Sequence, residues 1–86
     1  MTTSTPTQVI RGYAEANRIK ITQHAWIRMV ERGVTEDDVV HALARCFSCR
    51  CGDRPNTWVV RGPDTVGDAL TLVVAVVDGV VVVTVY

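Results

Sequence analysis

The valine-rich run at residues 69–86 constrains the fold more than any other part of the chain. Asp78-Gly79 divides this run into pieces of nine and seven residues, each too short to cross a membrane as a helix. An Asp-Gly pair between valine-rich segments is the strongest short-range signal of a β-hairpin. We therefore predict a type I′ turn at Asp78-Gly79, with antiparallel pairing of residues 72–77 and residues 80–85.

Both faces of this predicted hairpin are apolar. The first arm sets Leu70, Leu72, Val74 and Val76 against Thr71, Val73, Ala75 and Val77. The second arm sets Val81, Val83 and Val85 against Val80, Val82, Thr84 and Tyr86. A sheet covered on one side should alternate polar with apolar residues, and two helices can cover only one face. We therefore expect the second face to bind another copy or a different protein, and the purified chain to dimerise or to be poorly soluble without its partner.

A second stretch, residues 22–38, has the pattern of a helix, a glycine break and another helix. On a helix with about 100° per residue, one arc carries Ala25, Trp26, Met29 and Val30, and the opposite arc carries His24, Arg28, Glu31 and Arg32. Thr22 is suited to cap the first helix, and Gly33 can take the positive φ that ends it. Thr35 and Asp38 form a variant of the capping box at the start of the second helix.

The other predicted elements complete an α+β domain. We expect a disordered tail at residues 1–7, a short helix at 8–17, a brief extended link at 19–21, and strands at 46–51 and 57–61. Because the helices precede the strands, we predict two layers, with N-terminal helices on one face of a three- to four-stranded antiparallel sheet. Residues 8–86 then form a single domain, since 86 residues can build only one modest core.

Charge and cysteine content bear on partners and compartment. A formal net charge of zero argues against a uniformly basic nucleic-acid coat. Nine cations nevertheless lie between residues 11 and 61 against six acids, so a local cationic patch is compatible with a neutral chain. The start of the sequence lacks the basic segment and apolar run of a signal peptide, and three cysteines are an odd number. We therefore expect a reducing cytoplasm and no association with a membrane.

Two motifs resemble those of a family of short bacterial proteins whose function is unknown. They are H-A-x-x-R-M-x-x-R-G-V at residues 24–34, followed by a capped helix with Asp38-Val39, and V-V-V-T-V-Y at residues 81–86. That family is similar in fold to RelE-type and MqsR-type toxins, which are endoribonucleases that cleave messenger RNA on the ribosome or free. The resemblance, over residues 19–86, implies a RelE-like fold and a cognate antitoxin, for which a zinc-finger protein is a candidate. MqsR-type sites rely on Lys, Gln and Tyr, of which this chain offers Lys20 and Tyr86.

Cleavage of RNA without a metal needs a base for the 2′-hydroxyl, an acid for the leaving 5′-oxygen and cations for the phosphorane. His24 can act as acid or base near neutral pH, while Arg28 and Arg32 can hold a phosphate through paired donors. A spacing of four along a helix brings these three side chains within reach of one another. Tyr86 can donate a proton or stack on a base. These four residues are the candidate catalytic residues.

The candidate RNA-binding residues are Lys20, Arg50, Arg54 and Arg61. The three arginines, together with Arg45, lie around the two strands before the hairpin, where they can track a phosphate backbone. They can equally be charges that solubilise an edge hairpin.

Other interpretations of the candidate catalytic residues stay open. The stripe on the first helix can be a solvated face in which Arg28 pairs with Glu31. Alternatively, His24 and Arg28 can hold backbone carbonyls in an architectural role. Tyr86 can simply fill the edge of the sheet.

Three cysteines form the pattern C-x-x-C-x-C at Cys46, Cys49 and Cys51. With His41 five residues upstream they can hold zinc, but a structural zinc site normally draws pairs of ligands from two separated turns. We therefore expect free, partly buried thiols, with Cys49 and Cys51 on one face of a strand, and no metal or cofactor. Trp26 and Trp58 are expected to join helix to sheet in the core.

We therefore hold two hypotheses on function. The first is a toxin-like member of a toxin–antitoxin pair, a metal-independent endoribonuclease that acts on messenger RNA. The second is a non-catalytic module on the same fold that binds protein or nucleic acid. A neighbouring reading frame with a C-x-x-C…C-x-x-C zinc finger would favour the first hypothesis, and an orphan gene would favour the second.

Overall fold

The computed structural model describes residues 5–86. Along the chain its elements are α1 (Pro6–Glu15), β1 (Ile19–Ile21), α2 (Gln23–Arg32), α3 (Glu36–Ala44), β2 (Ser48–Cys51), β3 (Thr57–Pro63), β4 (Ala69–Val76) and β5 (Val80–Val85). The class is α+β, as predicted, with three helices and five strands in the described part of the chain. None of these helices is both long enough and apolar enough to span a bilayer.

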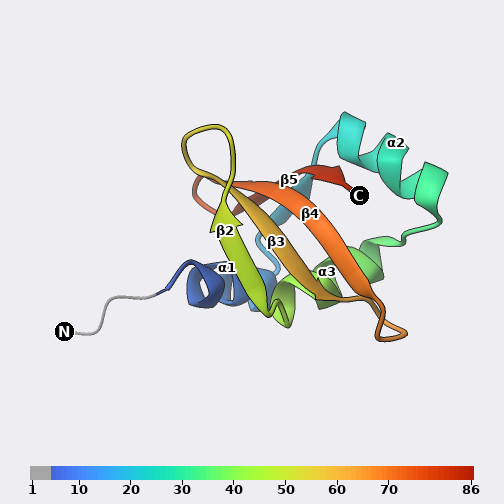
Figure 1. Cartoon of the computed structure of the whole chain (residues 1–86), viewed down its shortest axis with the longest axis horizontal. Coiled ribbons are helices and arrows are strands. Elements are labelled where there is room, and N and C mark those ends of the chain that lie inside the picture. Colours follow the sequence, from blue (N-terminus) through green and yellow to red (C-terminus); the bar gives the residue numbers. More distant parts are fainter. Residues whose placement is uncertain (1–4) are drawn as a thin grey trace.

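The strands form one mixed sheet in the order β1-β5-β4-β3-β2 (Figure 1). Neighbouring strands are antiparallel except β1 and β5, which are parallel, with Ile19 opposite Val80 and Ile21 opposite Val82. The expected three- to four-stranded antiparallel sheet is therefore too small, and β1 lies between α1 and α2, so the helices do not all precede the strands. The sequence predicts only a link at β1, because three residues are too few to show a period and their pairing strand is distant in the chain.

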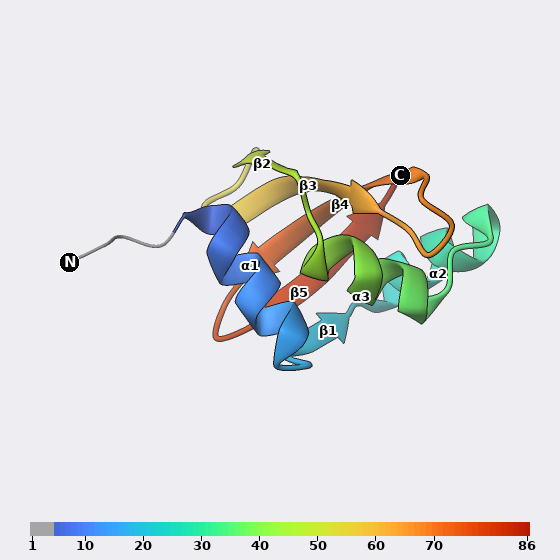
Figure 2. The ribbon, with the colours of Figure 1, turned by 90° about the horizontal axis from the view of Figure 1, so that it is seen from below.

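Helices α1 and α3 cover one face of the sheet (Figure 2). Between them and the sheet lies the core, which includes Ile10, Ala14, Val39, Ala42, Leu43, Val60, Leu72, Val74, Val80 and Val82. Helix α2 packs against β5 instead, and it lies near the C-terminal end of the chain (Figure 1). We call the opposite face of the sheet, which includes Val59, Val73, Ala75 and Val81, the open face.

Helix α3 and strand β3 approach each other closely at Gly62. A Cβ atom at this position would lie 2.8 Å from the carbonyl carbon of Ala42 and 3.1 Å from its Cα. Both neighbours are backbone atoms, so no side-chain rotation can make room. Glycine at this one position therefore allows α3 to pack on the sheet at the distance that the core requires.

The helix boundaries of α2 and α3 agree with the sequence. Thr22 caps α2 by accepting a hydrogen bond from the backbone N–H of Ala25, and Gly33 ends it in the left-handed region with φ of 67°. Thr35 and Asp38 form the predicted reciprocal capping box of α3.

Helix α1 begins earlier than expected, at Pro6 instead of residue 8. Thr5 caps it and Gln8 completes a capping box, with proline in the first turn where its missing N–H costs nothing. Of the tail expected at residues 1–7, residues 5–7 therefore belong to the cap and first turn, and residues 1–4 lie outside the described residues.

The predicted hairpin is present, with Leu72 opposite Val85 and Val76 opposite Val80. Its connection has three residues, 77–79, in place of a two-residue turn, and Asp78 and Gly79 both have positive φ, 50° and 127°. The extra loop residue shifts the register by one. A bulge at Val83, which has no counterpart in β4, restores the predicted pairing further along.

This bulge also changes which side chains enter the core. Val80 and Val82 are buried as one set, but after the bulge Val85 is buried, whereas strict alternation would have placed Thr84 on that side. Thr84 thus joins Val73 on the open face. The burial of Val85 in place of Thr84 therefore differs from the predicted alternation because of the bulge alone, since a single extra residue inverts the faces of all later residues in the strand.

Trp26 does not anchor the core as predicted, since 43% of its surface is exposed. Of the apolar arc on α2 only Ala25 and Met29 are buried, because this helix contacts the sheet mainly through β5 and so covers a narrow stripe. Trp58, on the helix side of β3, is partly buried against the core, as expected. The strand predicted from residue 46 begins at Ser48, while Cys46 is fully buried in the core.

Candidate nucleic-acid interface

The pairing of the strands places three rows of side chains across the open face. Arg61 is opposite Ser48 and Thr71, and the backbone N–H of Tyr86 donates to the carbonyl of Thr71. The second row is Arg50, Val59, Val73 and Thr84, and the third is Thr57, Ala75, Val81 and Lys20. Lys20 of β1 and Tyr86, the last residue, thereby lie on the same face of the sheet as Arg50 and Arg61.

Three of the four candidate RNA-binding residues lie in these rows. Arg50 and Arg61 are exposed near one edge of the sheet, and Lys20 is exposed at the other. The fourth, Arg54, is in the connection between β2 and β3. Arg45, by contrast, is the C-cap of α3, so it does not belong to the rows. The open face therefore carries positive charge at both edges.

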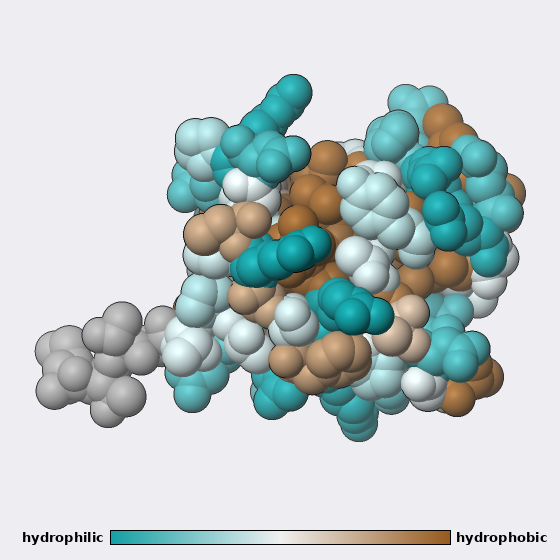
Figure 3. Space-filling view, in the orientation of Figure 1, coloured by the Kyte–Doolittle hydropathy of each residue, from teal (hydrophilic) through white to brown (hydrophobic). Residues whose placement is uncertain are grey.

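A hollow of about 550 Å³ lies on the open face. Its lining comprises Gly52, Asp53, Arg54, Thr57, Val59, Val73, Ala75, Val83, Thr84 and Tyr86. Figure 3 shows an apolar floor between two walls covered with hydrophilic side chains, one over the β2–β3 connection and the other over α2. Asp53 and Arg54 supply the charged groups of this lining. The hollow thus combines an aliphatic floor with a polar rim, and the sequence indicated the apolar strands but not this shape.

Arg61 has an aromatic neighbour at the edge of the open face. Its guanidinium carbon lies 6.0 Å from the centre of the Phe47 ring, at the outer limit for a cation–π contact. Phe47 itself is 59% exposed. Both an aromatic face and a guanidinium plane are therefore accessible to solvent here.

The proposed catalytic stripe lies on α2, which adjoins β5, the strand that leads to Tyr86. His24 and Arg32 are exposed, and Arg28 is partly covered and lies 3.8 Å from Glu31. This ion pair agrees with the solvated-face interpretation, though a single pair at that distance adds little stability. Thr22 fixes the start of the helix by donating from its hydroxyl to the carbonyl of Val83, at the bulge, over 3.2 Å.

The architectural interpretation of His24 and Arg28 finds no support among the described residues, where neither side chain donates to a backbone carbonyl. Two other residues have that role. Arg11 donates from Nε and Nη2 to the carbonyl of Cys46, at 3.1 and 2.7 Å, and His41 Nδ1 lies 2.9 Å from the carbonyl oxygen of Pro63. The sequence contained no signal for either bond, because both join segments that meet only in the folded chain.

Asp38 has a second role that the capping box did not predict. Besides Thr35, its carboxylate accepts hydrogen bonds from the backbone N–H and the hydroxyl of Thr65, at 3.0 and 2.6 Å. The bond from the Thr65 hydroxyl, followed by those from the backbone, holds the pKa of Asp38 well below its ordinary value. One carboxylate thus ties the start of α3 to the β3–β4 connection.

The three cysteines are free thiols. Cys49 and Cys51 are opposite Val60 and Trp58, so they share the helix side of β2, as expected. Burial raises the pKa of Cys46, and burial raises the pKa of Cys49 to about 11. Within residues 5–86, no three His, Cys, Asp or Glu side chains come together in an arrangement that could hold a metal ion.

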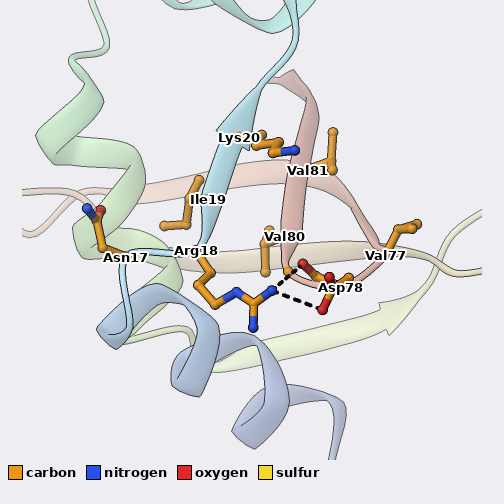
Figure 4. Close-up of a pocket in the computed structure, with 9 residues that line it drawn as sticks. Asn17, Arg18, Ile19, Lys20, Val77, Asp78, Val80 and Val81 are labelled. Carbon is orange, nitrogen blue, oxygen red and sulfur yellow. Dashed lines mark hydrogen bonds and ion pairs between the residues drawn. The ribbon is translucent and has the colours of Figure 1, made fainter.

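A second hollow, of about 400 Å³, lies where β1 starts beside the β4–β5 connection (Figure 4). Arg18 closes one side by pairing with the carboxylate of Asp78 at 2.9 Å and with the carbonyl of the same residue at 3.1 Å. Lys20 lies on the opposite side, next to Val81 (Figure 4). Because the exposed Arg18–Asp78 pair is accessible to water, we regard it as a clamp on the turn rather than a ligand site.

Comparison of the chain with protein-family models, with curated proteins and with solved structures finds no match. Function is therefore inferred from the geometry of the open face and of α2.

Proposed function

We propose that this chain is a toxin-like endoribonuclease with a RelE-like fold, which binds single-stranded RNA on the open face and cleaves it without a metal. The observation that carries this proposal is the register of the sheet, which aligns Arg50, Arg61 and Tyr86 on one surface bordered by Arg54. Cations that track a backbone and an exposed aromatic ring that stacks on a base are the usual components of a single-strand site.

The charge arrangement also supports RNA as the ligand. The net charge of the whole chain is zero. Among the residues that line the hollow or lie in the three rows across the open face, however, the cations outnumber the single acid, Asp53. Phosphates should therefore be attracted to this face. Binding through a few such contacts should weaken as salt concentration rises.

In the proposed reaction the 2′-oxygen attacks the adjacent phosphorus and the bond from phosphorus to the 5′-oxygen breaks, which leaves a 2′,3′-cyclic phosphate. His24 takes the proton of the 2′-hydroxyl, Tyr86 gives a proton to the leaving 5′-oxygen, and Arg28 and Arg32 stabilise the charge of the phosphorane. The histidine and the two arginines come from α2, and Tyr86 would contribute from the adjoining end of β5. The resemblance of residues 24–34 to a toxin-like family supports this assignment, as does the solvent exposure of His24, which leaves its ring accessible to a substrate.

As a toxin-like chain it would act in the cytoplasm beside a cognate antitoxin. The apolar floor of the hollow supports a protein partner, because an exposed apolar surface with a polar rim is typical of interaction sites.

The alternative is a non-catalytic RNA- or protein-binding module on the same fold. One observation favours it: no hydrogen bond within residues 5–86 orients the His24 ring, whereas general acid–base residues are commonly held by a second group.

The decisive experiment has two parts. Induced expression in a bacterial host, with RNA integrity followed over time, tests cleavage in cells. Incubation of the purified chain with single-stranded RNA in the presence of a chelator tests whether cleavage is direct and independent of metal. RNA that is bound but stays intact in both assays would establish an RNA-binding module. RNA that is neither bound nor cut would overturn both the endoribonuclease and the RNA-binding module.

A further inference from the structure

The floor of the hollow is not explained by RNA binding. It is formed by Val59, Val73, Ala75 and Val83, which have neither a planar ring on which a base can stack nor a group that can hydrogen-bond to a base edge. Phosphates and one base can be held by the cations and Tyr86, at the edges. An aliphatic hollow of about 550 Å³ is, however, within the range of sites that take apolar groups.

A second copy of this chain fits the open face poorly. Two such faces brought together would oppose positively charged edges, because Lys20 lies at one edge of the sheet and Arg50 and Arg61 lie near the other. Like charges opposed across an interface disfavour that pairing strongly. The occupant should therefore carry negative charge around an apolar group.

We propose that the hollow is the docking site for an acidic polypeptide segment of a partner protein, which inserts one bulky apolar side chain between Val59, Val73 and Val83 and pairs its carboxylates with Arg50, Arg54 and Arg61. A bulky apolar anchor within a polar rim is the usual form of a binding hot spot. This inference deepens the proposed function and rests on it in one respect: the segment covers the cations that RNA would use, so partner and RNA exclude each other.

The test starts with phage-displayed random peptides selected on the immobilised full chain. We expect the enriched peptides to share a large apolar residue flanked by Asp or Glu. Enrichment of basic peptides, or of none, would overturn the proposal.

A synthetic peptide with the enriched sequence then measures the role of the floor by calorimetry. Val73→Ser should weaken its binding by about tenfold, because a buried aliphatic contact is lost. The matched control is Val77→Ser, an exposed valine outside the hollow, which should stay within about twofold of the unchanged chain. Equal binding by Val73→Ser would show that the floor is unused. Val59→Ser repeats the measurement if circular dichroism shows that Val73→Ser is unfolded.

Competition with a single-stranded RNA oligonucleotide separates this inference from the proposed function. RNA should displace the peptide, and Val73→Ser should bind RNA as well as the unchanged chain does. If RNA also uses the floor, Val73→Ser should weaken the binding of peptide and of RNA equally, and that result would overturn the proposal. Simultaneous binding of peptide and RNA would also overturn it. If the peptide binds but RNA does not, the proposed function fails while the docking site stands.

Discussion

At the scale of single residues, the polar side chains divide into those that hold the fold and those that are exposed. Arg11, His41 and Asp38 each hold a backbone group of a distant segment. His24 and Arg32 are exposed on α2 and serve no such contact among the described residues. This division makes catalytic and structural roles separable by mutation.

We expect His24→Ala and Arg28→Ala to abolish RNA cleavage while leaving stability nearly unchanged. Loss of a general acid–base group typically lowers the rate by ~10²–10⁴, and an exposed substitution such as that of His24 changes the free energy of unfolding by less than ~0.5 kcal/mol. Arg28 is partly covered, but it loses only a weak ion pair with Glu31. Thermal melting and cleavage are to be measured on the same preparations. A His24→Ala protein that is destabilised but still active would remove this residue from the catalytic assignment.

His41→Ala is the matched comparison, because it removes the other histidine. The carbonyl of Pro63 loses its donor in this variant, which should cost ~1–3 kcal/mol of unfolding free energy. Activity should then fall only as far as the folded fraction falls.

The second residue-scale prediction concerns pH. Hydrogen bonds lower the pKa of Asp38 in the folded chain, so its contribution to stability is present above the ordinary carboxyl pKa of about 4 and is lost as the pH falls below it. Asp38→Asn should therefore be less stable than the unchanged chain at pH 7, and the difference should shrink in acid. Denaturant unfolding at a series of pH values measures this. Asp37→Asn, which removes a charge from the same turn, should show no comparable difference, and a pH-independent difference for Asp38→Asn would contradict the assignment.

At the scale of elements, the packing of α3 on β3 depends on the absence of a side chain at residue 62. Gly62→Ala should lower the free energy of unfolding by ~1–3 kcal/mol, because its Cβ would overlap the backbone of Ala42. Chemical denaturation is the measurement. Gly12→Ala is the control, since nothing lies within 4 Å of a Cβ there and alanine favours a helix, so this variant should be as stable or more stable. Equal effects of the two substitutions would show that the close approach is not required.

At the scale of the whole molecule, the open face combines apolar surface with positive charge. Repulsion between cations should keep the isolated chain from self-associating at low ionic strength, and salt should relieve it, since the Debye length falls from ~10 Å at 0.1 M to ~3 Å at 1 M. Sedimentation at both salt concentrations should show more dimer or aggregate at the higher one. A chain that stays monomeric at high protein concentration under both conditions would contradict the expected self-association through the open face.

What the sequence by itself determined is local. The caps at Thr22, Gly33 and Thr35, and the hairpin around Asp78-Gly79, were all predictable because each depends on residues that are near in the chain. The α+β class was predictable for the same reason, since the hydrophobic period changes along the chain.

Only the tertiary structure decided how these pieces meet. The parallel β1–β5 pairing and the bonds of His41 and Asp38 join segments that are distant in the chain, which no short-range pattern encodes. The candidate RNA-binding residues could be named from their charge, but their common surface depends on the register of five strands. Register is selected by burial of a whole face at once, so it belongs to the folded chain and not to any segment of it.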